Sequence, residues 1–517
     1  MLSHADIVAA LEAEDAFPEG GPVERRESHI SVVFLTRDRA WKLLKPVQFD
    51  FLDFSTREAR YVVCWNELLL NRRLAPDVYL DVVPVTDDGG RARVGGLGIP
   101  IDWLIVMRRL PEAGTLQARI EAGRARQADI DRVLDVLAPF FAAAPTDAAI
   151  AANGRPEAVH RNASENFAVL AAHADGGSLS AERVARLRSM QLQFIAEREA
   201  LFEARIAAGR VREGHGDLKP EHCYVSDGNV AIVDGVGFSK RLRCVDTLDE
   251  ISFLAVDLAV LGREDLAEHL RDEYRRRTGD DAPPELAAFF ESYRLAVRAK
   301  VACLSAGGRS ADERAELLRD AAQCVDEALA RLGPHHAPRL IAVFGLSGTG
   351  KSTVAGALAE RIGAARLCSD EVRKEIHGLA ARERGTAELY SAAANERTYA
   401  ALFDRAADRL QSGISVIVDA TFRRRRDRER LCAVAAAAGV TPLFVECRCP
   451  PAVARRRIAA RGAQGRDASD ADVAVYESQA RRYEPPGEIP VENLLSIDTD
   501  GPLEDSIRPI VSRLAVV

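Results

Sequence analysis

The sequence predicts a protein of mixed α/β and α+β class, in which strands and many helices precede a C-terminal doubly wound parallel sheet. Strand and helix patterns alternate from 340 to 510, which is typical of a parallel sheet covered by helices. Breaker residues fill 333–338, just before this alternation begins. We therefore expect a first domain over 1–332, a linker at 333–338 and a second domain over 339–517.

Composition is that of an ordinary globular protein, with 47% hydrophobic and 29% charged residues in 517. The net charge of −8 argues against a protein that wraps nucleic acid through bulk electrostatics. Nine cysteines occur without a CxxC pair, which favours reduced thiols over disulfides or zinc. Neither a secretion signal nor an apolar run of membrane-spanning length is visible, so we expect a cytoplasmic protein without a membrane partner.

The strongest motif is a glycine-rich turn between an apolar run and an alanine-rich segment. The stretch LIAVFGLSGTGKST matches G-x-x-x-x-G-K-[ST] at every fixed position. Its glycines let backbone N–H groups point at phosphate oxygens, and the following helix adds positive charge from its N-terminus. Lys351 is expected to neutralise the β- and γ-phosphates, and Ser352 to bind Mg²⁺. The predicted nucleotide contacts are Gly345, Ser347, Gly348, Thr349, Gly350, Lys351, Ser352 and Thr353.

An aspartate follows the next apolar segment, where the sequence reads RLCSDEVRK. A strand that ends here would place Asp370 at the carboxyl end of the sheet, facing the nucleotide. The segment resembles small P-loop kinases, including polynucleotide kinases and zeta-toxin-like kinases. That resemblance implies that Asp370 is the general base and that Arg373 contacts the acceptor. Asp370 as the N-cap of a helix is the alternative.

A second buried strand, over 413–419, ends in Asp419. This pattern suits a Walker-B-like position, where the carboxylate holds Mg²⁺ through water. Four arginines, 423–426, follow at once. They either clamp a charged acceptor or begin a solvated helix, and the sequence does not choose between these interpretations.

The segment after the strand at 443–447 resembles the lid helix of these kinases. Arg457 and Arg461 are four residues apart and share one helical face. They are expected to stabilise charge on the transferred phosphoryl group when the lid closes. Surface salt bridges are the alternative for both.

The N-terminal part reads as a lysine-bearing hairpin, then a glutamate-bearing helix, then more strands. Lys42 lies on the second hairpin strand, and Glu58 and Glu67 lie on the helix. This is the layout of a kinase small lobe, where the lysine binds phosphates and the glutamate holds the lysine. A solvated lysine at a sheet edge is the alternative. The expected strands are 31–36, 40–44, 78–85 and 103–107, and the expected helices are 3–16, 56–74, 125–144, 180–208, 249–276 and 284–331.

Further on, the segment HGDLKPEH begins at His215, and Asp234 ends an apolar strand about seventeen residues after Asp217. The first segment resembles the catalytic loop of protein-kinase-like enzymes. In that scheme Asp217 orients and deprotonates the acceptor hydroxyl, and Asp234 bridges the metal to the phosphates. Three aspartates nearby (246, 249 and 257) are expected to be capping and solvated residues.

The order of these motifs resembles the aminoglycoside-phosphotransferase-like family, and more narrowly its bacterial bifunctional members, which carry a C-terminal P-loop kinase. The resemblance implies a bilobal protein-kinase-like first domain. It also implies that Lys42 and Glu67 form the phosphate-anchoring pair, that Ser31 lies near the nucleotide, that Asp217 is the base and that Asp234 is a metal ligand. Glu58 stays open as a rival to Glu67. The segments that carry the resemblance are ESHIS (27–31), WKLLKPV (41–47), FLDFS (51–55), NRRLAP (71–76) and HGD (215–217).

The sequence departs from that family at His222, where the catalytic loop normally carries asparagine. Asparagine offers a hard oxygen to Mg²⁺, whereas imidazole is a softer ligand. Either this second metal position is altered, or the lobe binds a nucleotide without turning it over. A surface or packing role for His222 is the plainer alternative.

Together these observations predict two sites that move the γ-phosphoryl group of ATP or GTP to a hydroxyl, with Mg²⁺ as cofactor. The acceptor stays open among sugars, aminoglycosides and nucleotide derivatives, and no aromatic stacking set supports a nucleic acid 5′-end. In one alternative the N-terminal domain is a non-catalytic scaffold, and in another the P-loop domain is only an ATPase. The sequence predicts no oligomeric state.

Overall fold

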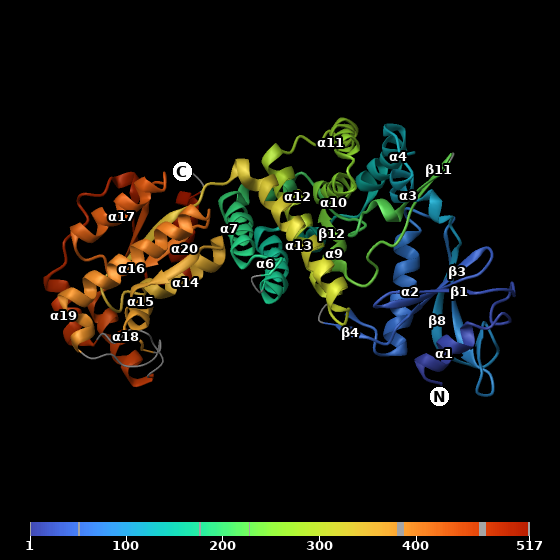
Figure 1. Ribbon diagram of the computed structural model, residues 1–517, viewed down its shortest axis with the longest axis horizontal. Helices are drawn as coiled ribbons and strands as arrows, with labels where there is room; N and C mark the ends of the chain where they lie inside the picture. Colours follow the sequence, from blue (N-terminus) through green and yellow to red (C-terminus); the bar gives the residue numbers. More distant parts are fainter. Residues whose placement is uncertain are drawn as a thin grey trace. The chain divides into compact units, whose positions relative to one another are not determined.

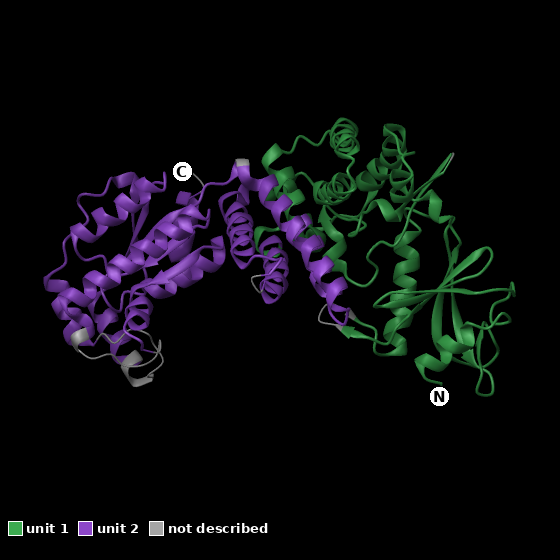
Figure 2. Cartoon of the chain, viewed as in Figure 1, with its two compact units in different colours: residues 1–158, 202–294 green, residues 159–201, 295–517 purple. Residues whose placement is uncertain are grey.

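The computed structural model describes residues 2–49, 52–174, 177–226, 228–379, 387–464 and 472–514. The chain divides into two compact units, drawn in different colours in Figure 2. Unit 1 comprises residues 1–158 and 202–294, and unit 2 comprises residues 159–201 and 295–517. Segments 159–201 and 295–332 therefore group with the C-terminal part, although the sequence analysis assigned them to the first domain.

Unit 1 contains an antiparallel six-stranded sheet in the order β1-β2-β3-β8-β6-β7 (Figure 1). The expected hairpin is present, and Lys42 on its second strand is in register with Val33 and Ile105. The helix α2 packs against β6 and β8, as amphipathic spacing predicts. The bounds are β1 Glu24–Glu27, β2 Ser31–Leu35, β3 Arg39–Leu44, β6 Tyr79–Asp87, β7 Ala92–Val94, β8 Ile99–Arg108 and α2 Arg57–Asn71; a short ladder joins β4 Gln48–Phe49 to β5 Leu52–Asp53.

The rest of unit 1 is mostly helical, with two short antiparallel ladders, one with its strands on either side of the segment from His215 to Asp234 and one within it. One ladder pairs β9 Val211–Glu213 with β12 Cys244–Asp246, and the other pairs β10 Cys223–Ser226 with β11 Asn229–Ile232. The helices are α1 His4–Leu11, α3 Leu116–Glu121, α4 Gln127–Ala143, α5 Ala148–Ala151, α8 Glu199–Ala207, α9 Lys240–Arg243, α10 Thr247–Val260 and α11 Glu264–Thr278.

Several expected helices are shorter or broken. The helix at 249–276 is two helices, α10 and α11, because Gly262 takes a left-handed backbone with a φ of 76°. The helix at 284–331 is α12 Pro284–Ser305 and α13 Ala311–Leu332, with Gly308 at a φ of 74° between them. The helix at 180–208 divides at Arg198 into α7 Ala181–Glu197 and α8. The sequence analysis missed α6 Pro156–His173.

Unit 2 is built on a five-stranded parallel sheet in the order β14-β15-β13-β16-β17, which confirms the expected parallel sheet. Successive residues of β13 face opposite sides: Ile341 and Val343 pack with α14 and α20, whereas Ala342 and Phe344 pack with α16 and α17. The strands are β13 Leu340–Phe344, β14 Ala365–Cys368, β15 Val416–Asp419, β16 Leu443–Arg448 and β17 Leu494–Asp498. The helices that follow β13 in the chain are α14 Lys351–Ile362, α15 Ser369–Ile376, α16 Ala392–Gln411, α17 Arg425–Ala437, α18 Pro451–Gln464, α19 Val473–Arg481 and α20 Leu503–Leu514.

The helix α7 is part of this second core. Its Ala196 is 2% exposed and belongs to the hydrophobic cluster that α14 and α20 form on the sheet. Polar contacts fix the same helix: Gln193 accepts a hydrogen bond of 2.5 Å from the Ser415 hydroxyl, and Glu197 pairs with Arg339 at 2.9 Å. The P-loop helix α14 therefore rests partly on a segment that lies more than 140 residues earlier in the chain.

Within the described ranges, no single helix has both the length and the apolar character to cross a membrane. Helix α4 and residues 148–154 together are long and apolar enough for a span, but the two segments are bent by 115° relative to each other.

Candidate active sites

The glycine-rich turn of unit 2 lies between β13 and α14, at the carboxyl end of the sheet. Gly345, Gly348 and Gly350 have φ angles of 147°, 80° and 80°, which L side chains rarely adopt. A Cβ on Gly345 would lie 2.6 Å from the Cys447 carbonyl oxygen, and one on Gly348 would lie 2.7 Å from that of Ala454. Backbone conformation and close packing therefore both require glycine in this loop.

Lys351 is the first residue of α14, so its ammonium group lies at the positive end of that helix. The side chain is only 8% exposed, and among the described residues it has no hydrogen bond or ion pair. Ser352 and Thr353 follow it in exposed positions. A buried lysine beside a helix N-terminus, without a carboxylate partner, is suited to receive an anion.

Two predicted nucleotide contacts, Ser347 and Thr349, also form hydrogen bonds within unit 2. The Ser347 amide donates to Gln479 Oε1 at 3.0 Å, and the Thr349 hydroxyl donates to the Leu346 carbonyl at 2.9 Å. Both bonds hold the shape of the loop, and Gln479 was missed by the sequence analysis because α19 lies far along the chain.

Asp419 ends β15, beside the strand that leads into the glycine loop. It is in register with Val343 of β13 and with Cys368 of β14, and it is 1% exposed. Its Oδ2 accepts a hydrogen bond from Arg366 at 3.1 Å, whereas its Oδ1 is buried with no partner among the described residues. A buried carboxylate oxygen without a donor, at the same sheet edge as Ser352, fits the hard oxygen ligands that Mg²⁺ prefers.

Asp370 lies in the first turn of α15, at the end of β14. It is not the N-cap, because Cys368 occupies that position, so the capping alternative is wrong. Arg373 donates to Asp370 Oδ1 at 2.7 Å and to Asn395 Oδ1 at 3.0 Å, and its guanidinium lies 4.9 Å from the centre of the Tyr390 ring. Arg373 is 6% exposed, yet its Nε has no described partner. The two residues that the sequence predicted as base and acceptor contact are thus hydrogen-bonded to each other.

Arg457 lies on α18 and reaches the glycine loop. Its Nη2 donates to the Thr499 carbonyl at 2.6 Å, and its Nη1 lies 3.4 Å from where a Cβ on Gly350 would be. Thr499 also donates to the Thr349 carbonyl at 2.6 Å, so it joins Arg457 to the loop. Arg457 forms no salt bridge with a residue that the structure describes, and the side chain of Arg461 lies outside the described residues.

In unit 1, Lys42 lies between two carboxylates. Its Nζ is 2.7 Å from Glu67 Oε1 and 3.0 Å from Asp234 Oδ1. Glu58 is exposed and lies 3.6 Å from Arg57, so Glu67 is the glutamate that holds Lys42. Burial opposes the lysine charge, but the two carboxylates more than offset it and raise the pKa of Lys42 well above its usual value.

Ser31 is buried, and its hydroxyl shares a hydrogen bond of 2.9 Å with Ser28. This contact shapes the turn before β2. Nearness of Ser31 to a nucleotide stays a prediction.

His222 lies between the two aspartates of the catalytic-loop segment. Its Nδ1 is hydrogen-bonded to the Asp217 carbonyl at 2.8 Å, and its Nε2 is 3.8 Å from Asp234 Oδ2. Lys219 pairs with Asp217 at 3.0 Å. No group of three or more His, Cys, Asp or Glu side chains is gathered around a metal-sized space in the described part of the chain. A cation held by Asp234 would therefore need oxygens from phosphate and water as well.

Residues that the sequence analysis missed hold this segment in place. Glu250 accepts hydrogen bonds from the amides of His215, at 3.1 Å, and Gly216. The Tyr79 hydroxyl accepts one from the Asp234 amide at 3.0 Å, and Asp234 itself has a left-handed φ of 62°. Burial raises the pKa of Glu250 to about 7, and burial together with the nearby His222 lowers the pKa of His215 to about 4.

Of the three aspartates expected to be capping and solvated, only Asp246 caps a helix, α10. Asp249 is buried in a pair with Arg294, with Oδ1 to Nε at 2.6 Å, and Asp257 is 4% exposed. The expectation of solvation is wrong for all three, because Asp246 is 6% exposed and pairs with Arg205, and because α10 is buried on nearly every side.

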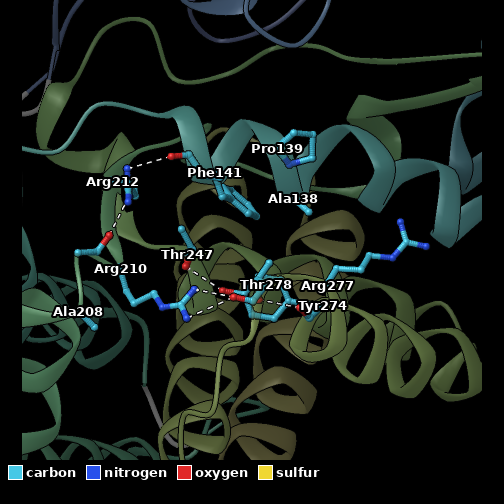
Figure 3. A pocket seen from close by; sticks show the side chains of 12 residues that line it. Ala138, Pro139, Phe141, Ala208, Arg210, Arg212, Thr247, Tyr274, Arg277 and Thr278 are labelled. Carbon is cyan, nitrogen blue, oxygen red and sulfur yellow. Dashed lines mark hydrogen bonds between the residues drawn. The ribbon is translucent and has the colours of Figure 1, made fainter.

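Figure 3 shows a separate cavity in unit 1, of about 430 Å³, between the C-terminal turns of α4 and α11. Arg212 donates to the carbonyls of Ala142 and Ala144, and Arg210 donates to that of Thr278. These arginines satisfy carbonyls at helix C-termini, as cations commonly do. None of the residues that line this cavity is a predicted site residue.

Two mycobacterial proteins match nearly all of this chain. The uncharacterized protein Rv2004c of Mycobacterium tuberculosis (strain H37Rv) and the uncharacterized protein Mb2027c of Mycobacterium bovis are each 35% identical over 491 residues, which is 94% of this chain and 94% of theirs. The chain belongs to the family of these proteins. The family described as AAA domain matches residues 340–486, which form a P-loop kinase-like domain on the parallel sheet.

Solved structures resemble about a third of the chain. A gluconokinase from Sinorhizobium meliloti 1021 is 24% identical, with 35% of this chain and 94% of that chain covered and a TM-score of 0.26. A putative kinase from Chloroflexus aurantiacus is 31% identical, with coverages of 34% and 93% and a TM-score of 0.29. The APS kinase CysC of Mycobacterium tuberculosis, in complex with AMPPNP and APS, is 21% identical, with coverages of 35% and 98% and a TM-score of 0.27.

Proposed function

We propose that this protein is an ATP-dependent phosphotransferase and that its P-loop domain moves the γ-phosphoryl group to a hydroxyl acceptor. One observation carries the proposal: the buried Lys351 and the Oδ1 of Asp419, both without a partner among the described residues, belong to adjacent elements at the carboxyl end of the same parallel sheet. The match of residues 340–486 to the AAA domain family supports it.

Each residue has a role that its surroundings support. The loop amides and Lys351 hold the triphosphate, while Asp419 and Ser352 hold Mg²⁺, which neutralises charge on the phosphates. Asp370 takes the proton of the acceptor hydroxyl as the new O–P bond forms and the bond from the γ-phosphorus to the bridging oxygen of ADP breaks. Arg373 keeps Asp370 in position, and Arg457 stabilises negative charge beside the loop.

We propose a second nucleotide site in unit 1, an aminoglycoside-phosphotransferase-like lobe pair in which Lys42 and Glu67 anchor phosphates, Asp234 is a metal ligand and Asp217 is the base. The pairing of Lys42 with both Glu67 and Asp234 supports this assignment. His222 between the two aspartates favours one alternative, in which the lobe binds ATP or GTP without transferring phosphate and acts as a scaffold. The acceptors we propose for the active sites are small molecules such as a sugar, an aminoglycoside or a nucleotide derivative.

Phosphoryl transfer from labelled ATP to a panel of such acceptors tests the proposal in the full chain. Asp370→Asn is expected to lower transfer by the P-loop domain by roughly 100-fold or more, and Asp217→Asn to abolish a separate set of products. Asp404→Asn, at an exposed position on α16, is the matched control. Loss of transfer in the Asp370 variant alone would assign unit 1 as a scaffold. ADP release without any phosphorylated acceptor would contradict the proposal and leave an ATPase.

A further inference from the structure

We propose that the acceptor of the P-loop domain carries an anionic group, a phosphate, sulfate or carboxylate, which is bound by Arg423, Arg424 and Arg482. The inference rests on the proposed phosphotransferase function and narrows its substrate class. The inference predicts that hydroxyl compounds with a negative charge are acceptors and that neutral polyols are not. The proposed function does not distinguish these two classes of acceptor.

The run of four arginines divides into two different pairs. Arg425 forms an ion pair with Glu429 at 2.7 Å, and Arg426 forms one with Glu396 at 3.2 Å, so both charges are paired at the surface. The side chains of Arg423 and Arg424 form no hydrogen bond or ion pair with any residue that the structure describes. Arg425 and Arg426 therefore fit the interpretation as a solvated helix start. Arg423 and Arg424 fit the interpretation as a clamp for an anion.

Arg482 joins this first pair through the backbone. The Glu484 amide donates to the Arg423 carbonyl at 2.9 Å, and Glu484 Oε2 accepts from the Arg425 amide at 2.7 Å. These two bonds place the end of α19 beside the start of α17. Arg482 is exposed, and it likewise has no partner among the described residues.

The same helix connects these arginines to the triphosphate loop. Gln479 lies in the last turn of α19, and Arg482 is the C-cap residue three positions later. Gln479 Oε1 accepts the hydrogen bond from the Ser347 amide in the glycine loop at 3.0 Å. The backbone of Arg482 therefore follows directly on a helical turn that contacts the nucleotide loop.

The electrostatics of the cluster favour an anionic ligand. Burial, together with the positive charges of Arg424 and Arg482, lowers the pKa of Arg423. Asp427 acts on Arg423 but is shared with Arg424, Arg426 and Arg430, so one carboxylate serves four guanidinium groups, and one oxygen of Glu484 is held by a backbone amide. Like charges held together in this way are stabilised when an anion binds, most strongly with guanidinium groups.

Tyr399 connects the cluster to the proposed base. Its hydroxyl accepts from the Phe422 amide at 3.2 Å, next to Arg423, and the charges of both Arg373 and Arg423 act on it. Arg373, hydrogen-bonded to Asp370, is buried and has an Nε without a described partner. Tyr399 therefore lies close to both Arg423 and the pair of Arg373 and Asp370.

Sulfate is the probe for a binding test in the full chain. A non-hydrolysable ATP analogue and Mg²⁺ fill the triphosphate site first, so that sulfate cannot occupy the γ-phosphate position. We expect calorimetry to detect sulfate binding, and we expect Arg423→Gln and Arg482→Gln each to raise the Kd about tenfold or more. Arg425→Gln and Arg426→Gln are the controls and should keep the wild-type Kd. No sulfate binding, or equal Kd values in Arg423→Gln and Arg425→Gln, would overturn the inference.

A turnover test separates this inference from the proposed function. Acceptors are supplied as matched pairs, glycerol with glycerol 3-phosphate and glucose with gluconate. We expect phosphoryl transfer to the anionic member of each pair. Arg424→Gln and Arg482→Gln, both at exposed positions, should raise the KM for the anionic acceptor about tenfold and leave kcat nearly unchanged. Transfer to the neutral members with an unchanged KM in both variants would overturn the inference and leave the proposed function intact. No transfer to any acceptor, with nucleotide still bound, would overturn the proposed function and this inference with it.

Discussion

The two lysines proposed to bind phosphate differ in their surroundings. Lys42 of unit 1 has two carboxylates within 3.0 Å, whereas Lys351 of unit 2 has no ion pair among the described residues and lies at a helix N-terminus. The cluster of Lys42, Glu67 and Asp234 carries a net charge of about −1, so a polyphosphate meets repulsion there until a divalent cation binds. The glycine loop carries positive charge before any ligand arrives. We infer that the two sites depend on Mg²⁺ to different degrees.

The largest expected effect concerns what each unit needs in order to fold. A fragment of residues 335–517 lacks α7, which places Ala196 in the core beside α14 and supplies Gln193 to Ser415. We expect this fragment to show no cooperative thermal transition, because one side of α14 and a buried hydroxyl lose their partners. Calorimetry of the fragment and of the full chain measures this. A fragment that melts as sharply as the full chain would show that α7 is dispensable.

The next prediction concerns the pH dependence of unit 1. As pH falls from 6.5 to about 4, the unfolded chain takes up a proton at His215 that the folded chain resists, so stability is lost. As pH falls from about 7 to 4.5, the folded chain takes up a proton at Glu250 before the unfolded chain does, so stability is gained. Both groups are buried, and each effect amounts to about 3 kcal/mol at most, so they nearly cancel in the wild type.

Glu250→Gln removes the gain of stability from Glu250 at low pH and leaves the loss of stability from His215. We expect this variant to lose about 3 kcal/mol of unfolding free energy between pH 6.5 and pH 4, relative to the wild type. The three tryptophans (41, 65 and 103) all belong to unit 1, so urea unfolding followed by tryptophan fluorescence reports this unit alone. A variant whose pH dependence equals that of the wild type would contradict the opposing titrations.

Substitutions of two glycines of unit 2 are expected to change its free energy of unfolding by smaller amounts and in opposite directions. Gly348→Ala should destabilise the glycine loop by about 1–3 kcal/mol, because the residue has a φ of 80° and a Cβ would meet the Ala454 carbonyl. Gly356→Ala lies in the same helix-loop element, in α14, with open space around it, and should stabilise unit 2 by about 0.5–1 kcal/mol. Calorimetric unfolding of both variants checks the signs, and equal signs would contradict the loop geometry.

The last expected effect, on nucleotide affinity, distinguishes the two glutamates of α2. Glu67→Gln should weaken binding of Mg²⁺ and ATP to unit 1 about tenfold, since Lys42 then pairs with Asp234 alone. Glu58→Gln, at an exposed position on the same helix, should change it less than twofold. Nucleotide titrations of the Lys351→Ala background isolate this site. Equal effects of the two substitutions would remove Glu67 from its role.

The sequence carried enough information for the local parts of both sites. The spacing of Gly345, Gly350 and Lys351 predicted the glycine loop, whose two glycines take positive φ angles, and a lysine on a strand before a glutamate on a helix predicted the pair of Lys42 and Glu67. Contacts between distant segments left no such pattern. Gln193 and Ser415 are hydrogen-bonded although 222 residues separate them. Asp249 was expected to be solvated because no residue close to it in the sequence indicates its pairing with Arg294.

The most direct test of the difference between the two lysines is a calorimetric titration of the full chain with a non-hydrolysable ATP analogue, with and without Mg²⁺. We predict two binding events with Mg²⁺, of which Lys42→Ala removes one and Lys351→Ala the other. Without Mg²⁺ we predict one event, which Lys351→Ala abolishes and Lys42→Ala leaves in place. A site that persists without Mg²⁺ in Lys351→Ala, or a single event that neither substitution alters, would contradict the account.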